Sequence, residues 1–313
     1  MLLAIDIGNT NIVFGVFEGE TLTQSWRLAT LRERTADELG ILVIDLFKVR
    51  GFDKSVIDGV IVASVVPSLT GTMSEMIARY FDRQATVVDP AEDMGMPVRY
   101  DRPSEVGADR LVNGIAAYER LGRARGVPVI VVDFGTATTF DCISAQGEYL
   151  GGVICPGVDI SADALFQRAA RLPRVDVRKP ERVIGQTTIE SMQSGLFYGY
   201  VAMVEGIEAR IRGELEADGS GVAVCVATGG MAAVIAEQTS VIEVVVPELT
   251  LHGLRIVWER SNVKTSSWVI PPSTAGPLKP ISVRKTEGTL SVSSVRRLGS
   301  YVTGPSRAYR SRW

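Results

Sequence analysis

Histidine and cysteine are scarce in this chain of 313 residues. The only histidine, His252, lies in a helix-like LTLHGL run with no serine turn beside it. A single histidine excludes HExxH zinc sites and two-histidine iron sites, and it leaves a Ser-His-Asp triad without support. The three cysteines, Cys142, Cys155 and Cys225, show no CxxC spacing, so we expect buried, reduced thiols. Any chemistry must therefore rest on carboxylates, hydroxyls, arginines and backbone amides.

Long apolar runs are also missing. No run approaches the roughly 18 residues that a membrane-spanning helix needs, and Asp6 interrupts the first apolar residues too early for a signal peptide. We therefore expect a soluble, cytoplasmic protein with no membrane contact. With 46% hydrophobic residues the chain has ample material for a core, and its length favours two domains.

The net charge of −3 conceals two regions of opposite sign. Residues 261–313 hold nine of the 33 basic residues and one of the 36 acidic ones, a net charge of +8, so the first 260 residues carry −11. An acidic body is a poor partner for nucleic acid, and we predict no such partner. The basic segment also holds eleven serines and five prolines without sustained apolar periodicity, which is typical of a poorly ordered tail.

The spacing of apolar residues predicts alternating strands and helices, and so an α/β fold. Helices are expected over Thr35–Phe47, Leu69–Phe81, Val106–Leu121, 160–170, 188–215, Met231–Glu237 and Leu249–Arg260. Strands are expected over Leu2–Ile5, Ile12–Phe17, Leu22–Leu28, Gly59–Val65, Ala85–Val88, Pro128–Val132, Thr139–Ser144, Tyr149–Ile154, Val222–Ala227 and Val241–Val246. Short turns at residues 18–21 and 145–148 predict two hairpins.

One strand-and-turn unit occurs twice. LAIDIGNTN (3–11) and IVVDFGTAT (130–138) each run from an apolar strand to Asp, one further residue and Gly, with a threonine close behind. Each leads into a predicted hairpin, and the two aspartates, Asp6 and Asp133, lie 127 positions apart. The repeat predicts two related α/β domains that face each other with the same turn.

Such a turn suits a phosphate group and a cation. Glycine lets backbone N–H groups approach a phosphate oxygen, and threonine adds a hydroxyl donor. Because a carboxylate repels a phosphate, the aspartate must act through a cation or its water shell. Two such turns could close over a triphosphate. The chain has neither a Walker A Gly-Lys-Ser/Thr nor a GxGxxG after a strand, so P-loop and Rossmann folds lose their main support.

Two further segments lie where strands end or helices begin. The ATGG segment (227–230) would let a flat ligand such as adenine approach the backbone, and it equally suits a plain tight turn. In EVGADR (105–110), Gly-Ala at a helix start exposes N–H groups that favour an anionic or acceptor group. Asp109 could accept a proton there and Arg110 could neutralise transferring charge. An acid favoured by the helix dipole and a surface arginine explain the pair equally well.

Seven segments together resemble the type III pantothenate kinase family. In order they are DIGNTN (6–11), EVGADR (105–110), DFGTATT (133–139), GEYLGGVICPG (147–157), ALFQRAARLPRV (164–175), MQSGLFYGYV (192–201) and ATGG (227–230). The resemblance implies the actin/hexokinase-like (ASKHA) superfold, with one ribonuclease-H-like domain over 1–122, a second over 123–260 and the basic tail over 261–313. It implies ATP-dependent phosphorylation of pantothenate to 4'-phosphopantothenate, the first step of coenzyme A biosynthesis. The family members are cytoplasmic homodimers that use Mg²⁺ and a monovalent cation, K⁺ or NH₄⁺.

The resemblance also implies roles for single residues. Asp6 is expected near Mg²⁺, Asp133 on the monovalent cation, and Asp109 as the proton acceptor for the pantothenate hydroxyl. The nucleotide would be bound by Asp6, Ile7, Gly8, Asn9, Thr10, Asn11, Ile12, Val13 and Thr136. Pantothenate would be held by Tyr100, Gly107, Ala108, Asp109, Arg110 and Thr188.

The chain departs from the family pattern in three places. Gln186-Thr187 stand where Lys-Asn is common, Val246-Pro247 replace Asp-Pro, and residues 261–313 match nothing in the family. Two other functions stay open: another phosphotransferase of the same superfold, acting on a sugar or a carboxylate, and a non-catalytic regulator like the Bvg accessory factors. A regulator could tolerate loss of Asp109 or Asp133, and both are present.

Overall fold

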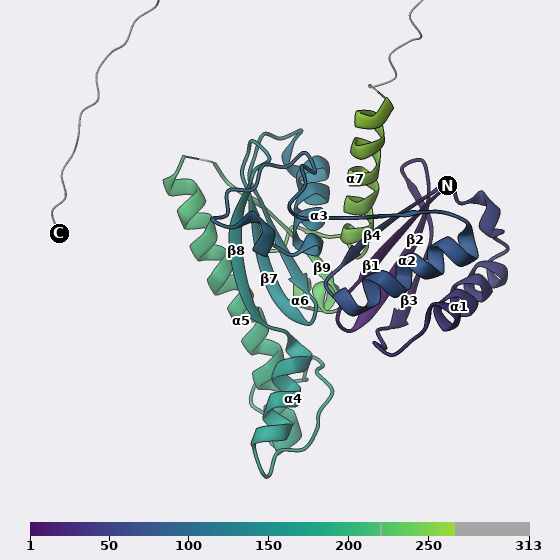
Figure 1. The fold of residues 1–313 in the computed structure, drawn as a ribbon. Helices are drawn as coiled ribbons and strands as arrows, with labels where there is room; N and C mark the ends of the chain where they lie inside the picture. The colour runs from purple at the N-terminus through teal and green to yellow at the C-terminus, as the bar shows by residue number, and fades with distance from the viewer. Residues whose placement is uncertain (220, 267–313) are drawn as a thin grey trace, which may run out of the picture. The chain divides into compact units, whose positions relative to one another are not determined.

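Two five-stranded sheets of the same topology organise the chain. The computed structural model describes residues 1–219 and 221–266, with side chains as far as residue 262. The first sheet has the order β3-β2-β1-β4-β5, and the second has the order β8-β7-β6-β9-β10 (Figure 1). The strands are β1 (Leu2–Ile7), β2 (Asn11–Glu18), β3 (Thr21–Ala29), β4 (Gly59–Ser64), β5 (Ala85–Val87), β6 (Val129–Phe134), β7 (Ala137–Ile143), β8 (Tyr149–Pro156), β9 (Val224–Gly229) and β10 (Val244–Val245).

In each sheet an antiparallel three-stranded meander is extended by parallel strands. The helices are α1 (Ala36–Val49), α2 (Pro67–Phe81), α3 (Ala108–Ala117), α4 (Val158–Arg168), α5 (Thr188–Ala217), α6 (Ala232–Ala236) and α7 (Leu249–Ser266). The equal order of the two sheets confirms the α/β fold and the internal duplication predicted from the repeated turn.

Helices α1 and α2 cover one face of the first sheet. The apolar side chains of β1, β2 and β4 on that face pack with those of both helices in one buried cluster. Thr35 begins α1 as its N-cap and forms a capping box with Glu38, as the sequence predicts. Pro67 lies at the first position of α2, where its missing N–H has no helical partner to lose.

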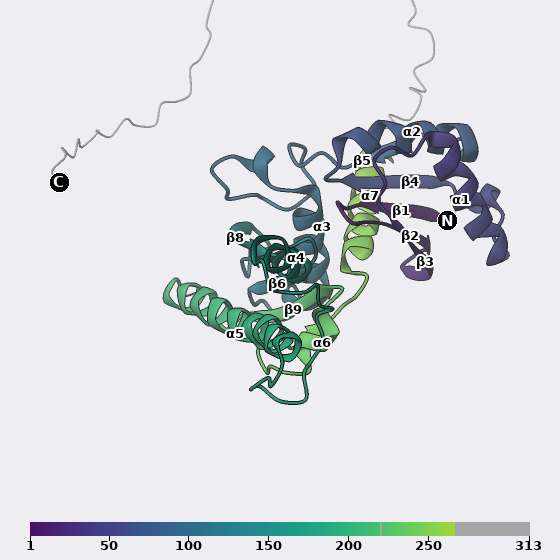
Figure 2. The ribbon, with the colours of Figure 1, turned by 90° about the horizontal axis from the view of Figure 1, so that it is seen from below.

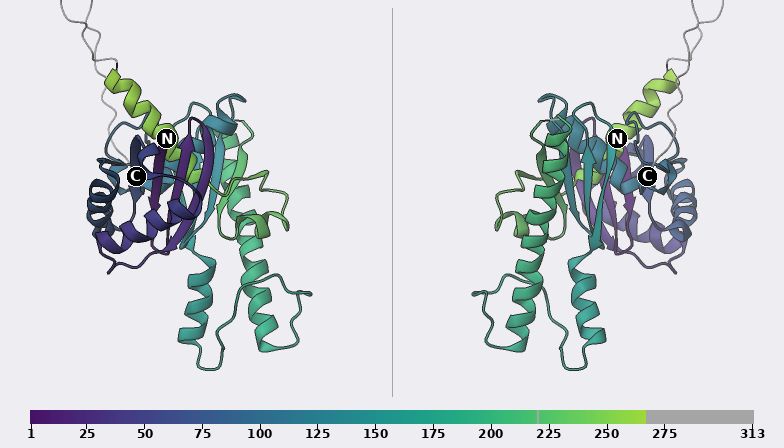
Figure 3. Two further views of the ribbon diagram at one scale, coloured as in Figure 1. Left: turned by 90° about the vertical axis from the view of Figure 1, so that its right-hand side faces the viewer. Right: turned by 90° about the vertical axis from the view of Figure 1, so that its left-hand side faces the viewer.

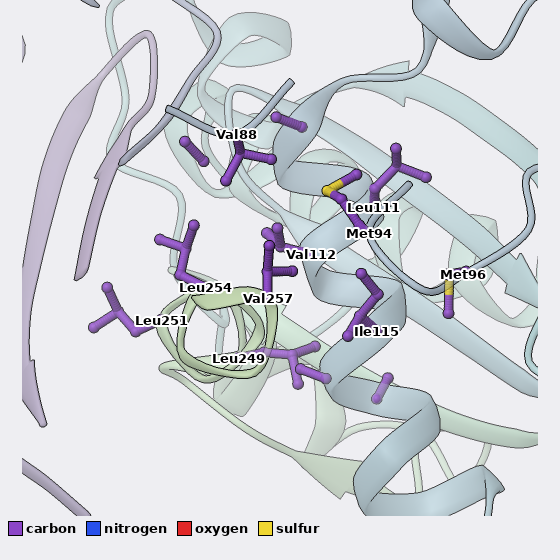
Figure 4. Packing of buried hydrophobic residues seen from close by; sticks show 14 of the residues in the cluster. Val88, Met94, Met96, Leu111, Val112, Ile115, Leu249, Leu251, Leu254 and Val257 are labelled. Carbon is purple, nitrogen blue, oxygen red and sulfur yellow. The ribbon is translucent and has the colours of Figure 1, made fainter. Parts of the chain in front are cut away.

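Helices α3 and α7 lie between the two sheets (Figures 1 and 2). A second buried cluster joins them to apolar residues of β1 and β4 on one side and of β6 and β9 on the other. Figure 4 shows Leu249 and Val257 of α7 on the side of Val112 and Ile115 of α3. The last described helix is thus buried against elements from both ends of the chain. The domain boundary expected at 122/123 falls between α3 and β6 and stays a prediction.

Helix α5 covers the other face of the second sheet, with a third buried cluster beneath it. Its N-cap Thr187 forms a capping box with Glu190. Figure 3 shows α4 and the first part of α5 extending together beyond the strands. We call this region, residues 158–195, the arm. Its exposed apolar side chains are Ile160, Leu165, Phe166, Val183, Ile184 and Ile189.

Several predicted element boundaries need correction. The predicted strand Val241–Val246 pairs only at Val244–Val245, because β10 is a short edge strand beside β9. The predicted helix Val106–Leu121 is α3 from Ala108, followed by one π-helical turn over Tyr118–Gly122. Helix α7 runs on to Ser266, into the segment predicted as tail. The rest of the predicted tail, 267–313, lies outside the described residues.

The three cysteines are free thiols. Cys142 and Cys225 are buried as expected, but Cys155 is only half-buried, so that part of the prediction is wrong. The last four positions of its strand, β8, alternate between half-buried and exposed, which leaves the Cys155 side chain partly open. None of the helices in residues 1–219 and 221–266 has the length and apolar character needed to cross a membrane.

Candidate active site

The two repeated turns occupy the same place in their sheets. Asp6 is the last residue but one of β1 and lies between Val13 of β2 and Ala63 of β4. Asp133 has the same position in β6 and lies between Thr139 and Thr228. The first turn has four residues, 8–11, between the paired Ile7 and Ile12. The second has three, 135–137, between Phe134 and Thr138. Because of this difference of one residue, Thr136 follows Gly135 directly, whereas Asn9 separates Thr10 from Gly8.

The turns meet through their threonines. The hydroxyl oxygens of Thr10 and Thr136 lie 2.9 Å apart in a hydrogen bond that joins residues 126 positions apart. Both side chains are exposed, so their hydroxyls are accessible to a ligand. Within each turn the glycine N–H donates to a carbonyl across the turn, Gly8 to Asn11 and Gly135 to Ala137, each at 3.0 Å. The structure therefore brings both predicted phosphate turns to one place.

Not all of the predicted nucleotide residues can act through their side chains. Ile7 and Ile12 are fully buried in the core beneath α1 and α2, so only their backbone is available. Asn9 receives a hydrogen bond from Arg32 at 3.2 Å, and the Thr30 hydroxyl donates to the Gly8 carbonyl at 2.7 Å. These contacts from the end of β3 hold the first turn in shape.

Three aspartates gather at the two turns. Burial, followed by the charges of Asp109 and Asp133, raises the pKa of Asp6 to about 8, and Arg27 acts in the opposite sense. Burial and the charge of Asp109 raise the pKa of Asp133 to about 7. Burial also raises the pKa of Asp109, against the N–H and charge of Arg110. Asp109 thus lies close enough to both turns to act on each, and the predicted trio is one site.

Asp109 is placed by the start of α3. Gly107 is the N-cap of this helix and supplies no side-chain cap, so the first N–H groups remain for a ligand or for Asp109. One Asp109 oxygen accepts from the Arg110 N–H at 2.8 Å. The Arg110 N–H, one of the amides predicted to be free in EVGADR, is therefore taken by the Asp109 side chain.

Asn113 is a site residue that the sequence analysis missed. Its amide nitrogen donates to the Asp133 carboxylate at 3.0 Å, and its amide oxygen accepts from the Thr250 hydroxyl at 2.8 Å. Asn113 lies one helical turn after Asp109, and this spacing is the signal that could have revealed it. The contact ties Asp133 to both α3 and the first turn of α7.

Gly229 of the ATGG segment has a positional role. Its φ of +91° suits glycine, and a Cβ there would lie 2.7 Å from an Asp133 oxygen. The glycine therefore lets β9 end beside the carboxylate. Gly230 has nothing within 4 Å of the position of a Cβ, so the backbone there is open.

Arg110 turns from the aspartates toward β7 and β8. Its Nε donates to the buried carboxylate of Asp141 at 2.7 Å, and its guanidinium lies 5.9 Å from the ring centre of Tyr149. The ring of Tyr100 lies 6.4 Å from that of Tyr149. The structure thus gathers two predicted pantothenate residues, Tyr100 and Arg110, around two residues that the sequence analysis missed.

Thr188 is not brought to this group. It is the exposed first residue of α5, within the arm that Figure 3 shows extending beyond the strands. Just before it, Gln186 and Thr187, which depart from the family pattern, donate backbone N–H groups to Glu190 and so start the helix. The other departure from the family pattern, Val246-Pro247, lies beside β9. The Val246 N–H donates to the Ala227 carbonyl, and the Pro247 carbonyl accepts from the Thr228 hydroxyl.

The carboxylates suit a hard cation shared with a ligand. Within residues 1–219 and 221–266 no three acidic, histidine or cysteine side chains form a complete metal cage. Mg²⁺ does not need one, since it binds through one or two carboxylates together with substrate phosphates and water. Asp6 has Asp109 and Asp133 near it and is followed by a turn whose Thr10 hydroxyl is exposed, so it fits that requirement.

Two ribonuclease-H-like sheets, each with an aspartate turn that meets the other's, define the actin/hexokinase-like (ASKHA) superfold. A crystal structure from Campylobacter jejuni, described as a Baf family transcriptional activator, has this fold with a TM-score of 0.51. It is 19% identical and covers 83% of this chain and 99% of its own, and at that identity it shows the fold alone.

The chain belongs to the type III pantothenate kinase family. The family model described as type III pantothenate kinase matches residues 2–210. The type III pantothenate kinase of Moorella thermoacetica is 52% identical over 261 residues, covering 83% of this chain and all of the relative. That of Myxococcus xanthus is 53% identical over 262 residues, covering 84% and 99%. The resemblance drawn from the motifs is confirmed.

Proposed function

We propose that this chain transfers the γ-phosphoryl group of ATP to pantothenate, forming 4'-phosphopantothenate in the first step of coenzyme A biosynthesis. The observation that carries the proposal is the convergence of Asp6, Asp109 and Asp133 where the Thr10 and Thr136 turns meet. Phosphoryl transfer needs this combination of phosphate donors, cation ligands and an acceptor for the nucleophile.

ATP would bind across the two turns. The backbone of residues 6–13 and the hydroxyls of Thr10 and Thr136 would donate to phosphate oxygens, each sheet contributing one turn. Asp6 would hold Mg²⁺, which supplies positive charge beside the β- and γ-phosphates when bound. Nucleotide binding must replace or share the Thr10–Thr136 hydrogen bond, since both hydroxyls take part in it.

Asp133 would hold the monovalent cation, K⁺ or NH₄⁺. Its carboxylate is held by Asn113 on one side and lies beside Gly229 on the other. Because Asp109 repels it, a cation at this point lowers the energy of both carboxylates. The cation bound at Asp133 would thereby balance the negative charge beside the turns that bind ATP.

Asp109 would accept the proton of the pantothenate hydroxyl. As the hydroxyl oxygen bonds to the γ-phosphorus, the bond from that phosphorus to the ADP oxygen breaks, and the proton passes to the Asp109 carboxylate. In a loose transition state little of the proton has moved, so Asp109 also serves by orienting the hydroxyl. Tyr100 and the segment Gly107–Arg110 would hold the rest of pantothenate.

We propose a cytoplasmic homodimer joined through the arm. The arm carries large apolar side chains in the open, among them Ile184 and Phe166. Thr188 can contribute to pantothenate binding only where this arm reaches a second subunit, because its own helix leads away from Asp109. The role of Thr188 therefore depends on the homodimer.

The test is release of ADP from ATP by the full chain, with and without pantothenate and with NH₄⁺, K⁺ or neither. We expect turnover only with pantothenate, raised by one of the cations, and no cation response in Asp133→Ala. Turnover with a sugar or another carboxylate in place of pantothenate would indicate a different phosphotransferase. No turnover with any acceptor would indicate a regulator.

A further inference from the structure

A buried carboxylate behind the site has no part in the proposed reaction. Asp141 of β7 is fully buried and accepts from Arg110 Nε at 2.7 Å, the Tyr149 hydroxyl at 2.7 Å and the Thr139 hydroxyl at 3.1 Å. Its two oxygens therefore meet three donors, two of them on the same oxygen. Such a charged group remains buried only because its partners are fixed around it.

The other sides of the Arg110 guanidinium are fixed as well. The ring of Tyr149 lies against it, with 5.9 Å between the guanidinium carbon and the ring centre. On β8, a Cβ at Gly152 would overlap the Phe140 carbonyl and lie 3.0 Å from Arg110 Nη2. Glycine at position 152 is therefore required first by the Phe140 carbonyl of β7, and it also leaves room for the guanidinium.

This arrangement sets the direction of the remaining donors. Because Nε points at Asp141, the planar guanidinium can turn only its Nη groups elsewhere. No hydrogen bond to another residue of the described chain takes up these Nη groups. The Tyr149 ring, which lies against the guanidinium, is 6.4 Å from the ring of Tyr100, another proposed pantothenate residue, so the guanidinium lies next to the proposed pantothenate site.

We propose that Asp141, together with Tyr149, is a positioning residue for pantothenate: it acts through Arg110, fixing the guanidinium so that its Nη groups meet the oxygen atoms of the substrate. This inference rests on the proposed function. Asp141 does not touch the substrate. It prevents the arginine from adopting the many rotamers of an exposed side chain, so that binding of pantothenate does not have to order it.

The first test is Asp141→Asn in the full chain. Asparagine keeps the shape and one oxygen that accepts from Tyr149 and Arg110, but it removes the charge that holds the guanidinium. We expect the KM for pantothenate to rise about 10-fold or more, since a hydrogen bond to a charged group is lost. The KM for ATP should change less than about twofold. Tyr149→Phe, which removes only one donor to Asp141, should shift the pantothenate KM in the same direction by a smaller factor.

A double-mutant cycle separates positioning from a general loss of structure. If Asp141 acts through Arg110, Asp141→Asn in an Arg110→Met chain should change the pantothenate KM by less than about twofold, because methionine has no charged donor for Asp141 to hold. The control is Glu208→Gln, which removes a charge from a buried ion pair with Arg212 on α5, outside the site. It should leave both KM values unchanged.

Each outcome decides the matter. A selective rise in the pantothenate KM that disappears in the Arg110→Met chain supports the inference. Equal changes in the KM values for pantothenate and ATP, or equal effects of Asp141→Asn with and without Arg110, would overturn it, while normal kinetics in the wild-type chain would preserve the proposed function. Absence of pantothenate phosphorylation by the wild-type chain would instead refute the proposed function, and this inference with it.

Discussion

Asp6, Asp109 and Asp133 are partly buried carboxylates, and each of the two turn aspartates has its pKa raised by Asp109. Carboxylates grouped in this way are stable when a proton or a cation compensates them. Arg27 reaches only Asp6 and only partly compensates it. The residues themselves therefore favour cation binding, apart from any likeness to known enzymes.

Asp109→Asn should reduce turnover by about 10²-fold or more, because the proton of the hydroxyl loses its acceptor and its orienting group. Binding of a non-hydrolysable ATP analogue, measured by calorimetry, should change less than about twofold, since the two turns are intact. Full turnover in the variant would remove Asp109 from the reaction. Equal loss of nucleotide binding and turnover would mean that it acts on ATP.

His252 provides a prediction about pH. Burial, and then the charges of Arg120 and Arg255, lower the pKa of His252 to about 4, whereas an unfolded histidine titrates near 6.5. Between these values the unfolded chain binds more protons than the folded one, so this residue's contribution to stability falls as pH falls from about 6.5 to 4.

The urea concentration at the midpoint of unfolding should accordingly fall further between pH 7 and pH 5 in the wild-type chain than in His252→Gln. As His252 is the only histidine, no other side chain of its type contributes to the difference. Equal changes in the two chains would show that the folded protein accepts the proton without cost.

At the scale of whole elements, α3 and α7 cross at a glycine. A Cβ at Gly253 of α7 would overlap the carbonyl oxygen of Val112 of α3, so the backbones of the two helices lie close together at this point. In an open helix the change from glycine to alanine stabilises by about 0.5–1 kcal/mol. At the crossing, the clash makes the same change destabilising, because the backbone of α3 cannot move aside as a flexible side chain does.

We therefore expect Gly253→Ala to lower the free energy of unfolding by about 1–3 kcal/mol, as overpacking does. The matched control is Gly213→Ala in α5, where nothing lies within 4 Å of the new Cβ and the residue is exposed. It should raise stability by about 0.5–1 kcal/mol. Urea unfolding of both variants measures the two changes in the free energy of unfolding. Changes of the same sign would contradict a close backbone contact at Gly253.

The elements that the sequence predicts are those set by neighbouring residues. The repeated turn follows from glycine and threonine close behind an apolar strand, and α1 follows from its cap at Thr35. The position of α7 could not be predicted, because an apolar helical stripe does not say which surface it covers. Asp141 also looked like an ordinary strand residue. Only the fold brings it to Arg110, which lies 31 positions earlier.

At the scale of the whole molecule, the arm gathers six exposed large apolar side chains of the described chain in one projecting region. Ile184 and Ile189 are 82% and 47% exposed. Side chains of this size in the open on one projecting region mark an interface more often than a free surface. The proposed homodimer would bury them and would bring Thr188 to a second subunit.

Changing Ile184 and Ile189 together to glutamate should convert the dimer to a monomer at micromolar concentration, measured by size-exclusion chromatography with light scattering. The control is the same pair of substitutions at Ile41 and Val49 of α1, which are 57% and 82% exposed. The added charge is equal, and the control should stay dimeric. A monomeric wild-type chain would refute the arm as the interface. A variant that stays dimeric after the arm substitutions would refute it as well.

The place of α7 has a consequence for synthesis on the ribosome. The strands of the first sheet are complete once Val87 has been made, but the face turned to α3 is closed only by residues from Leu249 onward. At about 5–20 residues per second, the intervening chain takes roughly 10–30 s to emerge. During that time the nascent sheet exposes an apolar face that its own chain cannot yet cover, and it is then a substrate for chaperones.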